Sequence, residues 1–230
     1  VAEESWTIER VYAEAKAALN INDYRTAIEY YEQLEARFPF GEYAQQALLD
    51  SAYAYYKTDE PETAIATLDR FMRVYPLNEN IDYAMYLRGL INFNRDMGIL
   101  EKYIPRDETQ RDPGSALQAL RDFTTLVNRF PTSRYSDDAA QRVVYLRNRL
   151  AQHELHVASY YMRRASYLAA ANRAKYVIEN YPRTPAMPDA LVVMAKAYKI
   201  LELNDLSEDA LRVLEANYPG HPGVAEVRKT

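Results

Sequence analysis

The stretch AYAYYKTDEPETAIATLDRFMRVYP, from Ala52 to Pro76, decides the fold. It contains two segments with helically spaced apolar residues, separated by the polar patch from Lys57 to Pro61. Asp59 and Pro61 in that patch favour a turn followed by the first residue of a new helix. The stretch closes on an aromatic residue and a proline, which cannot continue a helix. It therefore predicts a helical hairpin.

An aromatic-proline pair closes one segment after another along the chain. The five pairs are Phe38-Pro39, Tyr75-Pro76, Phe130-Pro131, Tyr181-Pro182 and Tyr218-Pro219. The first two prolines are 37 residues apart, as are the last two, whereas the middle spacings are 55 and 51. A period in the thirties is typical of helical solenoids, in which one hairpin cannot bury its own apolar face and stacked neighbours bury it jointly.

Small residues recur in register with these prolines. Twelve residues before the closing prolines stand Ala27, Ala64, Ala119, Ala170 and Ser207. A second register of small residues falls in the first helix of four repeats, at Ala15, Ala52, Ala158 and Ala195. Small side chains let two helix backbones approach closely. The pattern resembles the tetratricopeptide (TPR) repeat and predicts an all-α fold, a right-handed α-solenoid of about five TPR helix pairs.

Ten helices are expected from this pattern. Their approximate ranges are 6–20, 24–37, 41–57, 60–74, 78–97, 113–129, 134–164, 167–180, 186–201 and 205–217. Residues 132–181 contain neither Gly nor Pro, so one unusually long helix is expected from about 133 to 164. We predict two domains, 1–131 with repeats one to three and 132–230 with repeats four and five.

The predicted pattern stops at residues 95–115, a connection much longer than the usual 2–8 residues between helices. Two interpretations stay open at this point. The segment is either a mobile surface loop or a contact element that packs its apolar side chains on another surface. Those apolar side chains are Ile99, Leu100, Tyr103 and Ile104.

Composition argues against several classes of function. The formal net charge of −5 argues against nucleic acid as the main partner, because phosphate binding needs a basic face. The chain has no cysteine and no apolar run of the length that a transmembrane helix needs. It opens at Val1 without an initiator Met, which we interpret as a processed or truncated form.

No catalytic, metal or cofactor motif stands out. His153 and His156 are three residues apart, so they depart from the zincin spacing, and no third ligand is evident. Asp137 and Asp138 fall in the first turn of the predicted long helix, where carboxylates favour the helix dipole. The sequence therefore predicts a protein that is not an enzyme and that holds no metal and no cofactor.

The first half is rich in aromatic residues and arginine. These residues include Phe38, Phe40, Tyr43, Tyr55, Tyr56, Arg70, Arg73, Tyr83, Tyr86 and Arg88. They either pack between repeats or line a binding surface. If some are exposed, burying an apolar ligand side chain contributes about 1.5–3 kcal/mol, more than the roughly 0–1 kcal/mol of an exposed ion pair. An extended peptide with an aromatic end is the ligand that this composition favours.

Specific stretches resemble the BamD family, the TPR lipoproteins of the β-barrel assembly (BAM) complex in the outer membrane of Gram-negative bacteria. The match covers nearly the whole chain. It is carried by RFPFGEY (37–43), YAYYK (53–57), DRFMR (69–73), NIDYAMYLRG (80–89), RDP (111–113), VASYY (157–161) and Asn172-Arg173.

This resemblance implies a location at the periplasmic face of the outer membrane, with a lipid anchor on an N-terminal cysteine that this chain lacks. It implies three kinds of partner: the periplasmic POTRA region of the barrel subunit BamA, accessory BAM lipoproteins, and the C-terminal signal of unfolded outer-membrane proteins. Contacts to the signal or to accessory subunits are predicted at Phe38, Phe40, Tyr55, Tyr56, Arg70, Arg73 and Arg88. Contacts to BamA are predicted at Tyr160, Arg164 and Arg173.

The predicted function is thus a scaffold and substrate-signal receptor in the assembly and insertion of outer-membrane β-barrels. The alternative is another TPR peptide-binding adaptor, either a periplasmic cell-wall coordinator or a cytosolic module.

Overall fold

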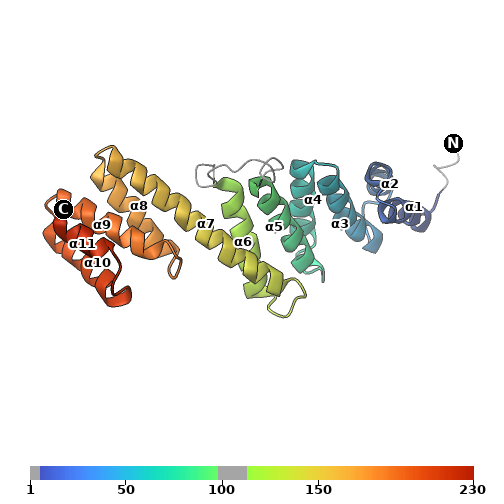
Figure 1. The fold of residues 1–230 in the computed structure, drawn as a ribbon. Helices are drawn as coiled ribbons and strands as arrows, with labels where there is room; N and C mark the ends of the chain where they lie inside the picture. Colours follow the sequence, from blue (N-terminus) through green and yellow to red (C-terminus); the bar gives the residue numbers. More distant parts are fainter. Residues whose placement is uncertain (1–5, 98–112) are drawn as a thin grey trace. The chain divides into compact units, whose positions relative to one another are not determined.

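The computed structural model describes residues 6–97 and 113–230, and every helix or strand assigned there is an α-helix (Figure 1). In chain order they are α1 Ile8–Asn20, α2 Tyr24–Arg37, α3 Glu42–Lys57, α4 Pro61–Val74, α5 Ile81–Met97, α6 Gly114–Arg129, α7 Ser136–Arg163, α8 Tyr167–Asn180, α9 Met187–Ile200, α10 Asn204–Asn217 and α11 Gly223–Lys229. The predicted all-helical fold is confirmed. Residues 98–112 of the predicted long loop lie outside the described residues. The two interpretations of that loop therefore stay predictions.

The prediction of ten helices is wrong by one, because α11 follows the last predicted helix in the described chain. The last predicted helix ended near residue 217, before the closing pair Tyr218-Pro219. Val224 and Val227 nevertheless give α11 an apolar side, and Val227 is buried among residues of α9 and α10. Gly223 permits the contact, since a Cβ there would lie 2.1 Å from a methyl carbon of Val192 on α9.

The chain divides into two compact units. The first contains α1 to α5, most of α6 and the start of α7 up to Ala140. The second contains α7 from Gln141 onward and α8 to α11. The long helix expected near residues 133–164 is present as α7, which has 28 residues. The predicted pair of domains, 1–131 and 132–230, stays a prediction.

The 37-residue period is visible in the backbone of the hairpin turns. Four turns each place one non-glycine residue in the left-handed region, at Asn22, Asp59, Ala165 and Glu202, with φ between 58° and 64°. In each case the next N–H donates to a carbonyl five residues back, at 2.9–3.0 Å: Asp23 to Ala18, Glu60 to Tyr55, Ser166 to Tyr161 and Leu203 to Tyr198. This is the hydrogen bond of a Schellman helix end, so the repeat is geometric as well as chemical.

The two registers of small residues form the core of the helix pairs. Ala15, Ala27, Ala52, Ala64, Ala119, Ala158, Ala170 and Ala195 are all fully buried. Ser207, which takes the alanine position in the last pair, donates its hydroxyl hydrogen to the Ala195 carbonyl at 2.8 Å. The burial of these small residues is what close packing between the helices requires.

Candidate functional site

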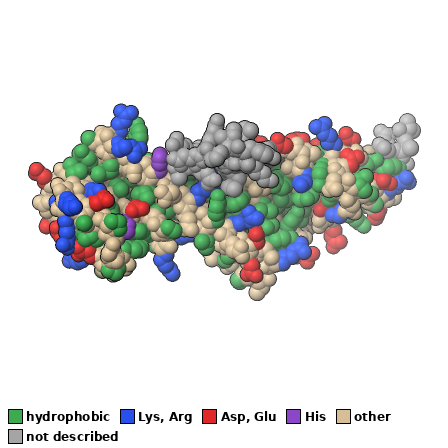
Figure 2. Space-filling model, in the orientation of Figure 1, with side chains coloured by type: hydrophobic (Ala, Val, Ile, Leu, Met, Phe, Trp, Pro, Cys, Tyr) green, Lys and Arg blue, Asp and Glu red, His purple; other side chains and the backbone are tan. Residues whose placement is uncertain are grey.

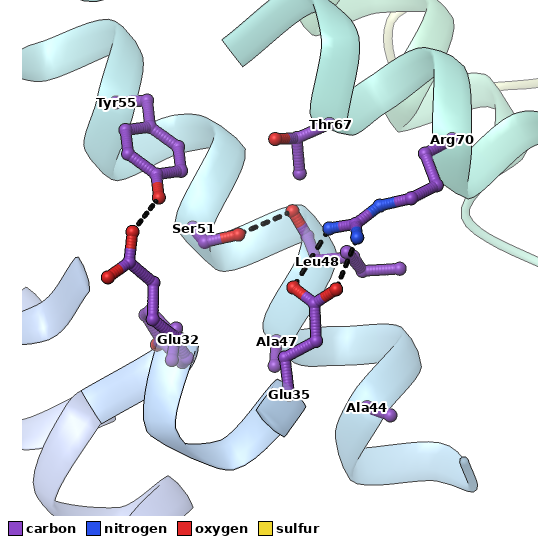
Figure 3. Close-up of a pocket in the computed structure, with 10 residues that line it drawn as sticks. Glu32, Glu35, Ala44, Ala47, Leu48, Ser51, Tyr55, Thr67 and Arg70 are labelled. Atoms are coloured by element: carbon purple, nitrogen blue, oxygen red, sulfur yellow. Dashed lines mark hydrogen bonds and ion pairs between the residues drawn. The ribbon is translucent and has the colours of Figure 1, made fainter. Parts of the chain in front are cut away.

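Two of the residues predicted to bind partners, Tyr55 and Arg70, line one small pocket between α2, α3 and α4 (Figure 3). The Tyr55 hydroxyl donates to Glu32 at 2.6 Å. Both terminal nitrogens of Arg70 donate to the Glu35 carboxylate, one of them at 2.8 Å. Burial, together with Glu32, raises the pKa of Tyr55 above the ordinary tyrosine value. The polar ends of both side chains are therefore engaged within the protein.

This pocket is too small for a peptide side chain. Its volume is about 40 Å³, near the space that one or two water molecules need. The Ser51 hydroxyl, on its α3 wall, donates to the Leu48 carbonyl at 3.1 Å (Figure 3). Tyr55 and Arg70 thus hold α2 against α3 and α4.

Arg88, another predicted contact residue, lies in an ion-pair network that joins three helices. Its Nε donates to Asp122 on α6 at 3.0 Å, and its Nη1 bonds to Asp69 on α4. Asp122 is 3% exposed. Burial lowers the pKa of Arg88, but the hydrogen bonds and charges of the two aspartates outweigh that effect and raise it. The geometry gives Arg88 a role in joining α4, α5 and α6.

The remaining predicted residues of the first unit differ in their accessibility. The Tyr56 hydroxyl accepts a hydrogen bond from Asn94, and the guanidinium of Arg37 lies 5.0 Å from the centre of the half-buried Phe38 ring. Phe40, in contrast, is 83% exposed. Arg73 is exposed on α4 and forms no ion pair with any described residue. The structure thus leaves Phe40 and Arg73 open to a partner and does not gather the seven residues into one site.

The three residues predicted to contact BamA lie on α7, on α8 and in the turn between them. Tyr160 is 45% exposed, and the Arg164 guanidinium lies 5.5 Å from the centre of its ring. Arg173 on α8 donates to Glu154 on α7 at 2.9 Å, with 47% of its side chain exposed. All three side chains are reachable from solvent, and Glu154 is the orienting partner that the sequence did not reveal.

Sequence reasoning missed a buried carboxylate that organises the first unit. Asp50 on α3 accepts hydrogen bonds from Tyr12, Lys16, Tyr31 and Gln46 at 2.8–3.2 Å. It is 7% exposed. Burial and the charge of Asp50 raise the pKa values of Tyr12 and Tyr31. The available signal was a single charged residue in the run from Ala47 to Ala54, where Ser51 is the only other strongly polar residue.

A groove of about 650 Å³ opens beside this carboxylate. Its walls come from α1, α3 and the turn that precedes α5. The lining residues are Tyr12, Glu42, Tyr43, Gln45, Gln46, Leu49, Asn78, Glu79 and Asn80. None of its Gln and Asn side chains is among the residues predicted to contact a partner.

The described residues provide neither a metal site nor a membrane span. No group of three or more His, Asp or Glu side chains in residues 6–97 and 113–230 is placed to hold a metal ion. No helix in those ranges is both long enough and apolar enough to cross a bilayer. Figure 2 shows acidic and basic side chains interspersed near both ends of the face in view.

Fold and repeat geometry together define a helical-repeat protein of the TPR type. A family model described as "YfiO: Outer membrane lipoprotein" matches residues 5–214. The TPR domain of P58(IPK) aligns with 96% of this chain and 65% of that one, at 13% identity and a TM-score of 0.48.

Curated relatives named "Outer membrane protein assembly factor BamD" match nearly the whole chain. The protein of Neisseria meningitidis serogroup B is 46% identical over 95% of this chain and 82% of its own length. The proteins of Xylella fastidiosa Temecula1 and Vibrio cholerae are 39% and 38% identical, over 96% and 90% of this chain and 75% and 86% of theirs. The chain belongs to this family of outer-membrane lipoproteins, the BamD family.

Proposed function

We propose that this chain is a non-enzymatic scaffold and substrate-signal receptor in the assembly and insertion of β-barrel proteins into the outer membrane. The observation that carries the proposal is the 46% identity, over 95% of the chain, to a relative named as an outer-membrane protein assembly factor. A lipid anchor at the periplasmic face of the membrane is part of the proposal. The chain would bind the POTRA region of BamA, accessory BAM lipoproteins and the C-terminal signal of unfolded barrel proteins.

In the first unit the accessible side chains favour Phe40 and Arg73 as direct contacts for the signal or for accessory subunits. Phe40 offers a large apolar surface, whose burial would supply most of the binding free energy. Arg73 has a guanidinium that could hold a carboxylate. The other five candidates, Phe38, Tyr55, Tyr56, Arg70 and Arg88, would act by keeping the helices in place.

In the second unit the accessible surface around Tyr160, Arg164 and Arg173 favours a contact with BamA. Glu154 orients Arg173 but engages only part of its guanidinium, because the carboxylate of Glu154 accepts a hydrogen bond from Nη1 alone. The remaining N–H groups could donate to an acidic residue of the POTRA region. Tyr160 adds a ring that is already backed by Arg164.

Arg173→Ala tests this contact. We expect the affinity for a purified POTRA fragment to fall at least tenfold, because truncating one side of a charge-assisted interface pair costs about 2–5 kcal/mol. Titration calorimetry would measure the affinity. Lys175→Ala, an exposed cation on the same helix, is the matched control and should bind like the wild type.

Glu154→Gln distinguishes a direct contact between Arg173 and the POTRA region from an indirect effect of the Arg173–Glu154 ion pair. If Arg173 acted only by pairing with Glu154, this variant would lose as much affinity as Arg173→Ala. Equal losses would remove Arg173 from the interface, and unchanged affinity in Arg173→Ala would do the same.

A further inference from the structure

None of the residues that line the groove between α1, α3 and the turn before α5 is among the contacts proposed above. Its volume of about 650 Å³ lies in the range of ligand sites. It shares no lining residue with the pocket of Tyr55 and Arg70. All its walls belong to the first unit.

A buried carboxylate orients two of the side chains that line this groove. Tyr12 and Gln46 both line the groove, and both donate to the buried carboxylate of Asp50, at 3.2 and 3.0 Å. Asp50 thus fixes their orientation, as a positioning residue does. Because the Gln46 bond uses its amide nitrogen, its amide oxygen stays available as an acceptor.

Further carboxamide groups come from α3 and from the turn before α5. Asn78 donates its amide hydrogen to the Gln45 oxygen at 2.6 Å and accepts from the Asn80 backbone N–H at 2.8 Å. The Gln45 amide nitrogen and the Asn80 side chain have no hydrogen-bond partner among the described residues. Carboxamides both donate and accept, so they match the N–H and C=O groups of an extended backbone.

The acidic side chains of the lining restrict the charge of the ligand that this groove can bind. Glu42 and Glu79 are exposed and form no ion pair with any described residue. No lining residue is basic. The nearby Lys16 is bonded to Asp50. Two unpaired carboxylates favour a cation and disfavour a chain-terminal carboxylate.

Exposed apolar side chains flank the lining residues in the chain. Phe40 precedes Glu42 by two residues and is 83% exposed, and Leu77 directly precedes Asn78 and is 97% exposed. Both follow the closing proline of a repeat, so they take the same position in two successive hairpins.

We propose that this groove binds an extended polypeptide segment that carries a Lys or Arg side chain beside an apolar one, rather than a free C-terminus. The carboxamides pair with its backbone, Glu42 and Glu79 hold its cation, and Phe40 or Leu77 contacts its apolar side chain. The proposal does not depend on outer-membrane proteins being the ligand.

The test uses two fluorescently labelled peptides with acetylated and amidated ends, which differ only in a central Lys or Glu between apolar residues. We expect the full chain to bind the Lys peptide at least ten times more tightly than the Glu peptide. A third version, the Lys peptide with a free C-terminal carboxylate, should bind no more tightly than the amidated one.

The double variant Glu42→Gln/Glu79→Gln should weaken binding of the Lys peptide about three- to tenfold, as expected for the loss of two surface charge pairs. Glu29→Gln/Asp59→Asn, which removes two exposed charges of the same unit outside the groove, should leave it unchanged. Asn80→Lys should abolish the preference for the Lys peptide.

The proposal is overturned by equal affinity for the Lys and Glu peptides, by binding of neither peptide, or by unchanged affinity in the double variant. Tighter binding of the free carboxylate, equal weakening in the control variant or an intact Lys preference in Asn80→Lys overturns it too. Since the peptides are not barrel-protein signals, none of these results bears on the role in outer-membrane assembly.

Discussion

The two units bury polar groups differently. In the first unit the carboxylates of Asp50 and Asp122 are 7% and 3% exposed, and each accepts hydrogen bonds from more than one other residue. In the described part of the second unit the buried polar side chains are Thr184 and Ser207, both uncharged. Its ion pairs, such as that of Arg173 with Glu154, include partly exposed cations.

Charged side chains therefore have different roles in the two units, although both units are built from the same type of helical repeat. In the first unit buried charges connect helices, so each one specifies which helices neighbour it. In the described part of the second unit no charged side chain is buried, so a partner can compete for its cations. A buried pair is costly to break, whereas an exposed pair contributes little to stability.

Alkaline pH should affect the first unit most, and this is the largest effect that we expect. Burial raises the pKa values of five tyrosines in its described part, Tyr12, Tyr31, Tyr53, Tyr55 and Tyr83. The second unit has one, Tyr181. An unfolded phenol loses its proton near pH 10, while the folded one keeps it. Stability is therefore present below that pH and is lost progressively above it.

The measurement is a joint pH titration of tyrosinate absorbance and helical circular dichroism. Phenol ionisation and loss of helix should coincide above pH about 10. Hydrogen exchange would locate the loss in α1 to α5 before α8 to α10. Ionisation of all the tyrosines with the helices intact would contradict the prediction.

Arg88→Ala against Arg173→Ala tests the contrast in charge directly. Removing Arg88 leaves Asp122 buried without its cation, so the free energy of unfolding should fall by about 3–5 kcal/mol. Removing Arg173 should cost at most about 1 kcal/mol, because the pair is partly exposed. Denaturant unfolding measures both changes. Equal costs would mean that the two units do not differ in this way.

Two glycines provide a smaller contrast. A Cβ on Gly89 would lie 2.7 Å from the buried ring of Phe123, so Gly89→Ala should destabilise the first unit by about 1–3 kcal/mol. Gly223→Ala should instead displace α11 from Val192. Since α11 has seven residues at the end of the described chain, that loss should stay local.

Denaturant unfolding would measure the first variant, and hydrogen exchange of α11 the second. Phe123→Leu, combined with Gly89→Ala, is the control. If the clash is the cause, the double variant should be more stable than the sum of the two single losses predicts.

The sequence predicted the hairpins well because the repeat shows in residue types that have few alternatives. Closing prolines, buried alanines, and Asn22 and Asp59 in the turns all fall in one register. Ala165 and Glu202 adopt the same left-handed turn geometry, although neither residue type favours it. α11 was missed because its two apolar residues follow a proline-rich stretch.

The sites were less predictable because partners lie far apart in the chain. Arg88 pairs with residues 19 and 34 positions away, and Asp50 gathers donors 4 to 38 positions away. Composition identified arginine and tyrosine as the candidate contact types. It did not separate Arg88, which holds helices together, from Arg73 and Arg173, which solvent can reach.

Recognition of outer-membrane proteins is the central claim, and one measurement tests it most directly. The full chain is titrated with a C-terminal peptide of an outer-membrane β-barrel protein, with and without its final aromatic residue. The account predicts binding that weakens at least tenfold without that residue, since burying one aromatic side chain contributes about 1.5–3 kcal/mol. Equal affinity for the two peptides, or no binding of either, would contradict the account of this chain as a substrate-signal receptor.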